Sequence, residues 1–196
     1  MASTLIAEHP TASRRIPPSA APPPVAAGAT GADSAEVELL RHLDRIRDVL
    51  ERARALVERG WLQHSWYVTR RPQPPTLLAR LRDALRSPDV DEVERACLVA
   101  AVAVAAHGGG ARPDIMRDAG PALDVVWDAL WERPGRPGPR SPARAVPPAV
   151  RAARMRDLVR WNDTAGRSRA EVLAMLDRAI SRTILSAMHA PGRRPV

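Results

Sequence analysis

The sequence predicts an all-α protein, a single compact helical bundle of about six helices that follows a disordered N-terminal tail. Three observations lead to this prediction. Large apolar residues recur three and four positions apart, which places them on one face of a helix. Residue types that start and stop helices stand at the edges of these apolar segments. The first part of the chain, by contrast, is rich in alanine, proline, serine and glycine.

The predicted domain spans residues 33–188, and its boundaries follow from composition. Residues 1–32 have almost no large apolar side chains, so they cannot bury enough surface to offset the entropy of ordering. Residues 189–196 are expected to fray as a disordered C-terminal tail. Inside the domain, residues 133–148 are rich in proline and arginine and predict a linker or a surface loop.

The first helix is predicted from a capping-box-like sequence at residues 33–36 to about Arg59. Gly60 ends it, as a glycine after the last turn usually does. Residues 61–69 hold two tryptophans and a tyrosine in irregular spacing. This segment is consistent with a short strand, a buried loop or an aromatic lid. The apolar residues of the helix form one continuous seam: Leu39, Leu43, Ile46, Leu50, Ala53 and Val57.

Two helices are predicted next, over residues 77–86 and 91–107. The first follows Thr76 as its cap and carries its leucines on one side. The second has an acidic first turn, which suits the helix dipole, and is apolar all round from residue 96 to residue 106. A helix that is apolar on every side is buried. We therefore expect it to be the central helix of the bundle.

Three further helices complete the prediction. Residues 121–132 and 149–161 carry apolar side chains at helical spacing. Asn162 and Asp163 break the second of these, because both side chains compete for backbone hydrogen bonds. A capping box at residues 168–171 then starts the last helix, which presents leucine and isoleucine for packing.

The basic charge of the chain is confined to one region. All 30 basic residues are arginine, a usage typical of GC-rich bacterial coding sequences, which weakens a functional interpretation of arginine as such. The formal net charge is +8. Residues 133–169 hold ten arginines against Asp157 and Asp163, whereas the rest of the chain is nearly balanced. Such a segment attracts phosphates or acidic partners, and a solvated proline-rich linker has the same composition.

A single cysteine, Cys97, excludes an internal disulfide framework and a cysteine-rich zinc site. A reducing, cytoplasmic setting is therefore expected. The pair Arg14-Arg15 is followed by prolines rather than by the apolar stretch of an export signal. The longest apolar run, residues 96–106, falls short of the roughly 20 residues that cross a bilayer. We expect no membrane partner.

One catalytic hypothesis is a cysteine-dependent hydrolase or transferase. In it Cys97 is the nucleophile, His64 or His42 is the base, and Asn162 or Asp163 orients the histidine. Against it, acidic residues precede the cysteine in the sequence and burial in an apolar helix predicts an inert thiol.

Metal and cofactor sites are not expected. The five histidines are scattered singly, without an i, i+4 pair or an HExxH sequence. No GxGxxG or Walker-type loop is present, and the glycines at residues 108–110 read as a helix exit.

A second alternative is a polyanion- or DNA-binding protein that uses the basic segment at residues 133–169. Four arginines would contact phosphates from one helix: Arg151, Arg154, Arg156 and Arg160. A helix-turn-helix, however, needs a tight turn and a recognition helix rich in polar side chains. The last helix is built for packing instead.

The interpretation we favour is a non-catalytic binding or regulatory module for a small-molecule or protein ligand. The helices account for nearly all apolar residues, and no reactive group of side chains is left over. The expected ligand-binding residues are those of two aromatic segments: Trp61, Trp66, Tyr67, Trp161, Asn162 and Asp163. The first explanation of residues 161–163 is a corner between two helices. They become a site only if they face a cavity.

Several short motifs follow one another along the chain in a fixed order: Gly60-Trp61, Cys97-Leu98, Trp161-Asn162-Asp163, Arg167-Ser168 and the run from Glu171 to Leu176. This order resembles a small, uncharacterised protein family of actinobacteria such as streptomycetes. The resemblance spans roughly residues 34–186 and implies a compact, mainly helical domain in a bacterial cytoplasm, with no activity attached.

Overall fold

The computed structural model describes residues 29–70, 76, 88–107, 114–131 and 146–190, with side chains from residue 34 onward. Six helices and one two-stranded sheet occupy these residues, which confirms the predicted all-α fold class. The helix predicted over residues 77–86 lies outside them, as do the first 28 residues and most of the segment at 133–148. None of the helices in the described ranges is both long enough and apolar enough to cross a bilayer.

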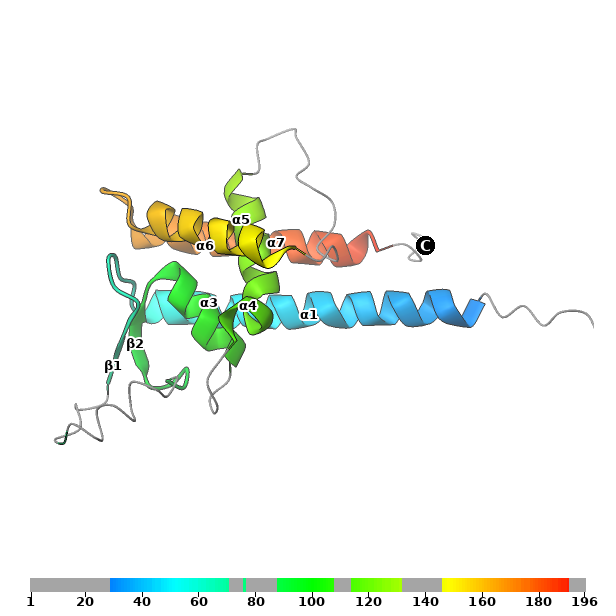
Figure 1. Ribbon diagram of the computed structural model, residues 1–196, viewed down its shortest axis with the longest axis horizontal. Helices are drawn as coiled ribbons and strands as arrows, with labels where there is room; N and C mark the ends of the chain where they lie inside the picture. Colours follow the sequence, from blue (N-terminus) through cyan, green and yellow to red (C-terminus); the bar gives the residue numbers. More distant parts are fainter. Residues whose placement is uncertain (1–28, 71–75, 77–87, 108–113, 132–145, 191–196) are drawn as a thin grey trace, which may run out of the picture.

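Two long helices, α1 (Ala29–Arg59) and α7 (Arg169–Met188), run side by side in opposite directions (Figure 1). The seam predicted on α1 is buried over most of its length, with Leu43, Leu50 and Val57 at its centre. The backbone amide of Gly60 closes the last turn of α1 on the carbonyl of Leu56. A Cβ at Gly60 would lie 2.8 Å from the backbone oxygen of Glu94. Only glycine therefore fits where the end of α1 approaches the backbone of residues 93–96.

The small sheet corrects one prediction. Residues 93–96 were expected in a helix, but they form strand β2 (Val93–Ala96), which pairs antiparallel with β1 (Tyr67–Thr69). Ala96 also exchanges backbone hydrogen bonds with Gly60 and Leu62. These partners are remote in sequence, and their pairing overrides the local preference of an acidic helix start. Helix α3 therefore begins only at Leu98 and ends at His107.

Helix α3 is the central helix, as predicted, and its first eight residues are buried. It contacts α1 on one side and the shorter helices α4 (Ile115–Asp118), α5 (Gly120–Trp131) and α6 (Pro148–Asn162) on the others. Helix α5 contacts both α6 and α7 and runs across them in Figure 1. The core that results surrounds α3, and it positions the end of α6 beside the start of α3.

Candidate functional site

Asn162, the last residue of α6, is only 1% exposed and uses its whole amide group in hydrogen bonds. Its Oδ1 accepts from the indole Nε1 of Trp61 at 2.8 Å and from the backbone amide of Leu98 at 3.1 Å. Its Nδ2 donates to the carbonyl of Leu62 at 3.1 Å and to Oδ1 of Asp163 at 2.8 Å. An asparagine amide has two donors and two acceptor lone pairs, so no capacity remains for a ligand.

These bonds join three segments, and we call them together the Asn162 corner: Trp61, Leu62, Leu98, Asn162 and Asp163. The amide of Leu98 belongs to the first turn of α3, where backbone N–H groups have no partner within the helix. The side chain of Asn162 supplies that partner. The corner therefore fixes the chain after α1 and the end of α6 against the start of α3.

The rim of the corner holds His64 in an unusual backbone conformation. His64 has φ of 56°, in the left-handed region that costs a non-glycine residue free energy unless its surroundings fix it. Its backbone amide donates to Oδ1 of Asp163 at 2.9 Å. The neighbouring Gln63 donates from Nε2 to the carbonyls of Asn162 and Thr164, each at 3.0 Å. The imidazole side chain is 73% exposed, and its Nδ1 lies 3.8 Å from Oδ2 of Asp163.

Trp161 is covered on one face by an arginine. The guanidinium of Arg167 lies 4.1 Å from the centre of the indole, and its Nε donates to the carbonyl of Trp161 at 3.2 Å. Arg167 also pairs with Glu171 at 2.7 Å. Glu171 and Ser168 form the predicted capping box at the start of α7. The tryptophan therefore serves to pack the turn between α6 and α7.

Cys97 stands at the first position before α3 rather than beyond its first turn, because the helix begins later than predicted. The residue is 7% exposed, and its Sγ accepts from the amide of Ala100 at 3.4 Å. Burial raises the pKa of the Cys97 thiol, and the negative charge of Asp163 raises it further. A raised pKa keeps the thiol protonated at neutral pH, which opposes nucleophilic attack. The pKa of His42, on α1, is lowered, chiefly by burial.

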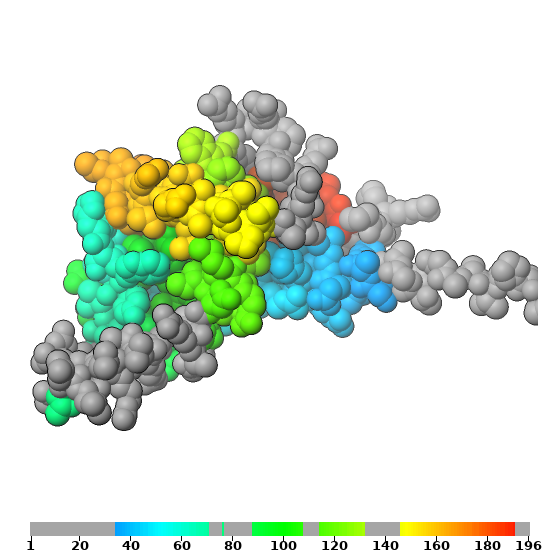
Figure 2. Space-filling model, in the orientation of Figure 1, coloured from blue at the N-terminus to red at the C-terminus, as the bar shows by residue number. Residues whose placement is uncertain are grey.

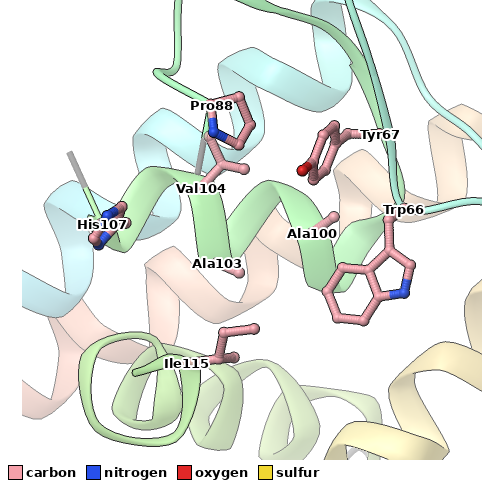
Figure 3. A pocket seen from close by; sticks show the side chains of 8 residues that line it. All are labelled: Trp66, Tyr67, Pro88, Ala100, Ala103, Val104, His107 and Ile115. Atoms are coloured by element: carbon pink, nitrogen blue, oxygen red, sulfur yellow. The ribbon is translucent and has the colours of Figure 1, made fainter. Parts of the chain in front are cut away.

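A cavity of about 340 Å³ lies between β1, α3 and α4 (Figure 3). We call it the α3 pocket. Trp66 and Tyr67 form one wall and are 47% and 38% exposed. The α3 wall consists largely of small side chains, because alanine occupies positions 100 and 103. Among the residues that the structure describes, the lining is Trp66, Tyr67, Pro88, Ala100, Ala103, Val104, His107 and Ile115.

The polar groups of the α3 pocket are few. Tyr67 points its hydroxyl toward α3, whereas the indole nitrogen of Trp66 faces away from the other lining residues (Figure 3). At the far end, Nε2 of His107 is buried and has no hydrogen-bond partner. A buried polar atom without a partner is uncommon in folded proteins and calls for an explanation.

Two of the arginines predicted to form a basic surface make ion pairs within the protein. Asp124 on α5 pairs with Arg151 at 2.8 Å and with Arg154 at 3.0 Å, and both arginine side chains are only 17% exposed. Arg156 and Arg160 are exposed on α6, which lies on the surface of the molecule (yellow in Figure 2). Two of the four arginines expected to contact phosphates are thus held by a buried carboxylate.

The six residues predicted to bind a ligand are divided between two places. Trp66 and Tyr67 line the α3 pocket, whereas Trp61 and residues 161–163 belong to the Asn162 corner or its rim. The α3 pocket also contains residues that the sequence did not single out, above all His107. One signal was available: a histidine at the end of an otherwise apolar helix needs a polar partner.

Within the described ranges no cluster of three or more histidine, cysteine or carboxylate side chains is arranged to hold a metal ion. A model of a protein family of unknown function matches residues 41–182, most of the domain described above. Comparison with curated proteins and with solved structures finds no match.

Proposed function

The chain belongs to this family of unknown function, DUF6197, and we propose that it acts as a binding module that holds a small apolar molecule in the α3 pocket. The observation that carries the proposal is the cavity of about 340 Å³, whose lining is mostly apolar over the residues that the structure describes. Ligand pockets in proteins measure about 300–1,000 Å³ and combine apolar walls with a few polar groups. The α3 pocket is at the small end of that range.

Two features of the walls support ligand binding. Trp66 and Tyr67 are 47% and 38% exposed and line the cavity. A bound apolar ligand would remove both its own surface and that of these rings from water, which favours binding. The opposite wall is rigid, because α3 is packed against the core along its buried positions. A preformed wall lowers the entropic cost of binding.

The cysteine-enzyme alternative is less well supported. The buried Cys97 thiol has a raised pKa, which opposes its ionisation, although the exposed His64 side chain has its Nδ1 3.8 Å from Oδ2 of Asp163. We expect iodoacetamide to alkylate Cys97 slowly in the folded protein at pH 8 and rapidly in the urea-unfolded chain. Equal rates in the two states would instead support an accessible, reactive thiol.

The polyanion alternative is weakened in the same way. Arg151 and Arg154 form ion pairs with Asp124, and these arginines would have to leave a buried partner to contact a phosphate. The proposal for the α3 pocket makes no such demand.

Titration of the full chain with N-phenyl-1-naphthylamine, a neutral dye that fluoresces in apolar surroundings, tests the proposal. We expect saturable binding of one dye per chain. Trp66→Ala removes one aromatic wall, worth about 0.5–1.5 kcal/mol, and should weaken binding about two- to tenfold.

Trp131→Ala is the matched control, because Trp131 is 60% exposed but does not line the cavity. This variant should bind the dye as the unmodified chain does. Non-saturable fluorescence, or the same loss in both variants, would show that the dye merely coats exposed aromatic residues.

A further inference from the structure

We infer that the ligand of the α3 pocket is an aromatic ring that carries an apolar alkyl chain, and that it lies along α3 with its ring at the Trp66 end. The inference rests on the proposed function of the α3 pocket. It adds the chemical class of the ligand and the direction in which the ligand is bound.

The elongated shape is assigned from the floor of the pocket, which is one face of a helix. Four lining residues follow the helical spacing i, i+3, i+4 and i+7: Ala100, Ala103, Val104 and His107. Side chains at this spacing follow one another along the same side of α3. From Ala100 to His107 the face extends for about 10 Å at the rise of an α-helix. A single ring would therefore cover only part of the floor.

The ring is assigned from the aromatic end of the pocket. Trp66 and Tyr67 stand at the Ala100 end of the α3 face (Figure 3). They are 47% and 38% exposed. Aromatic rings attract one another beyond the effect of buried area, through offset stacking or edge-to-face contact. The short side chain of Ala100 lets a ring approach α3 closely, so an aromatic ring gains more at this end than an aliphatic group of the same size.

The alkyl chain is assigned from the other end of the pocket, where the walls are aliphatic. Toward His107 the floor carries Val104, and Ile115 of α4 lies across from Ala103 (Figure 3). Neither Val104 nor Ile115 is aromatic, so a ligand is stabilised here by the burial of its methylene groups. The Nε2 atom of His107 is buried and therefore offers no hydrogen bond to a ligand. An apolar chain attached to the ring fits this end.

Displacement of N-phenyl-1-naphthylamine from the full protein by three alcohols tests the assignment: 2-phenylethanol, 4-phenyl-1-butanol and 4-cyclohexyl-1-butanol. All three carry one hydroxyl, so its effect on Kd cancels in each comparison. The two butanols differ only in the aromaticity of the ring, and the cyclohexyl compound is the more hydrophobic. We nevertheless expect the phenyl compound to bind about two- to fivefold more tightly. The two additional methylene groups of 4-phenyl-1-butanol should make it bind about tenfold more tightly than 2-phenylethanol.

Two variants probe the two ends separately. In Trp66→Leu the ratio of the cyclohexyl and phenyl Kd values should fall to about one or below, while the gain from the longer alkyl chain is unchanged. In Ile115→Ala the tenfold gain from the longer chain should fall to about threefold, while the ring preference is unchanged. Trp131→Leu alters an exposed tryptophan that does not line the pocket and is the control. Thermal unfolding of each variant checks that it is folded.

The outcomes separate the two proposals. Equal or tighter binding of the cyclohexyl compound to the unmodified protein overturns the aromatic ring, and so does a ring preference that survives in Trp66→Leu. Equal Kd values for 2-phenylethanol and 4-phenyl-1-butanol overturn the alkyl chain, and so does a gain that is unchanged in Ile115→Ala. In each of these cases the α3 pocket is still a binding site. A protein that binds neither the dye nor any of the three alcohols overturns both proposals.

Discussion

The Asn162 corner and the α3 pocket both include residues of α3 and are opposite in chemistry. The corner is polar and saturated: the amide of Asn162 makes four hydrogen bonds to protein groups and is 1% exposed. The pocket is apolar and unsaturated, since it has exposed aromatic walls and a buried His107 Nε2 without a partner. A polar group whose bonds are all made within the protein holds the structure together. Aromatic surface left exposed beside a cavity is available to a ligand.

The sequence drew attention to residues 161–163 as a candidate site, whereas the structure offers more space for a ligand in the α3 pocket. Trp161, Asn162 and Asp163 are the more distinctive sequence, yet their contacts are internal. The pocket is made largely of alanine, valine and proline, which attract no notice in a sequence. Distinctive residues reveal which contacts the fold needs, and the unsatisfied surface reveals where a ligand fits.

The largest expected effect comes from Asn162→Ala. This variant removes the partner of the buried Leu98 amide and of the partly buried Trp61 indole and Leu62 carbonyl. We expect the free energy of unfolding in urea to fall by about 3–5 kcal/mol.

Thr164→Ala, at the exposed rim, is the control and should change the free energy of unfolding by less than about 0.5 kcal/mol. If Asn162→Ala cost less than about 1 kcal/mol, the net value of an ordinary hydrogen bond, the corner would not be the structural element described here.

The elements that sequence could predict are those whose signals are local. The buried seam of α1 follows from apolar spacing, and the start of α7 follows from a capping box of four consecutive residues. The sheet was missed because β2 is fixed by partners about thirty residues away rather than by its own sequence. The links between Asn162 and Trp61 span 101 residues, so their pairing was not visible either.

The candidate site was predicted only in part for a related reason. The aromatic residues Trp66 and Tyr67 were expected to bind a ligand, but a cavity arises from missing side-chain volume on α3 and from the distance to α4. Neither the empty volume nor the distance between the helices can be derived from the sequence of a single segment. The buried pairs of Asp124 were also missed, although a carboxylate within the apolar run of α5 was a signal that a cation must lie opposite.

A second prediction compares the two faces of α3 directly. Ala101 is fully buried in the core, whereas Ala103 lines the cavity and is 8% exposed. Ala101→Leu should lower the free energy of unfolding by about 1–3 kcal/mol, because the added atoms overpack the core.

Ala103→Leu adds the same atoms to empty space and should leave the thermal unfolding temperature nearly unchanged. It should also weaken dye binding, because the new side chain fills the cavity. Equal destabilisation by both variants would mean that the cavity is closed in solution.

A third prediction concerns the exposed end of the turn that follows the corner. Ser168→Ala removes the helix cap of α7 and should cost about 1 kcal/mol, measured by urea unfolding at pH 7. The backbone amide and side chain of Ser168 lower the pKa of Glu171 below its ordinary value of 4.5.

Because the folded-state pKa is lowered, the stabilisation from Glu171 is fully present above pH 4.5 and is lost as the pH falls through the folded-state value. The difference in stability between the unmodified chain and Glu171→Gln should therefore shrink between pH 6 and pH 3. A difference that grew on acidification would contradict this assignment of the cap.

The smallest expected effect on stability, and the sharpest contrast with Asn162→Ala, is that of His107→Leu. Asn162 is a buried residue beside the start of α3, whereas His107 is the partly buried last residue of α3, with a buried Nε2. His107 loses no hydrogen bond in the change, because its Nε2 has none. Replacing an unpaired buried polar group by an apolar one of similar size is neutral or stabilising, so the free energy of unfolding should change by no more than about 1 kcal/mol and should not fall. A loss of about 2 kcal/mol in the ligand-free chain would mean that the imidazole is already satisfied within the fold, and the difference between a saturated corner and an unsaturated pocket would disappear.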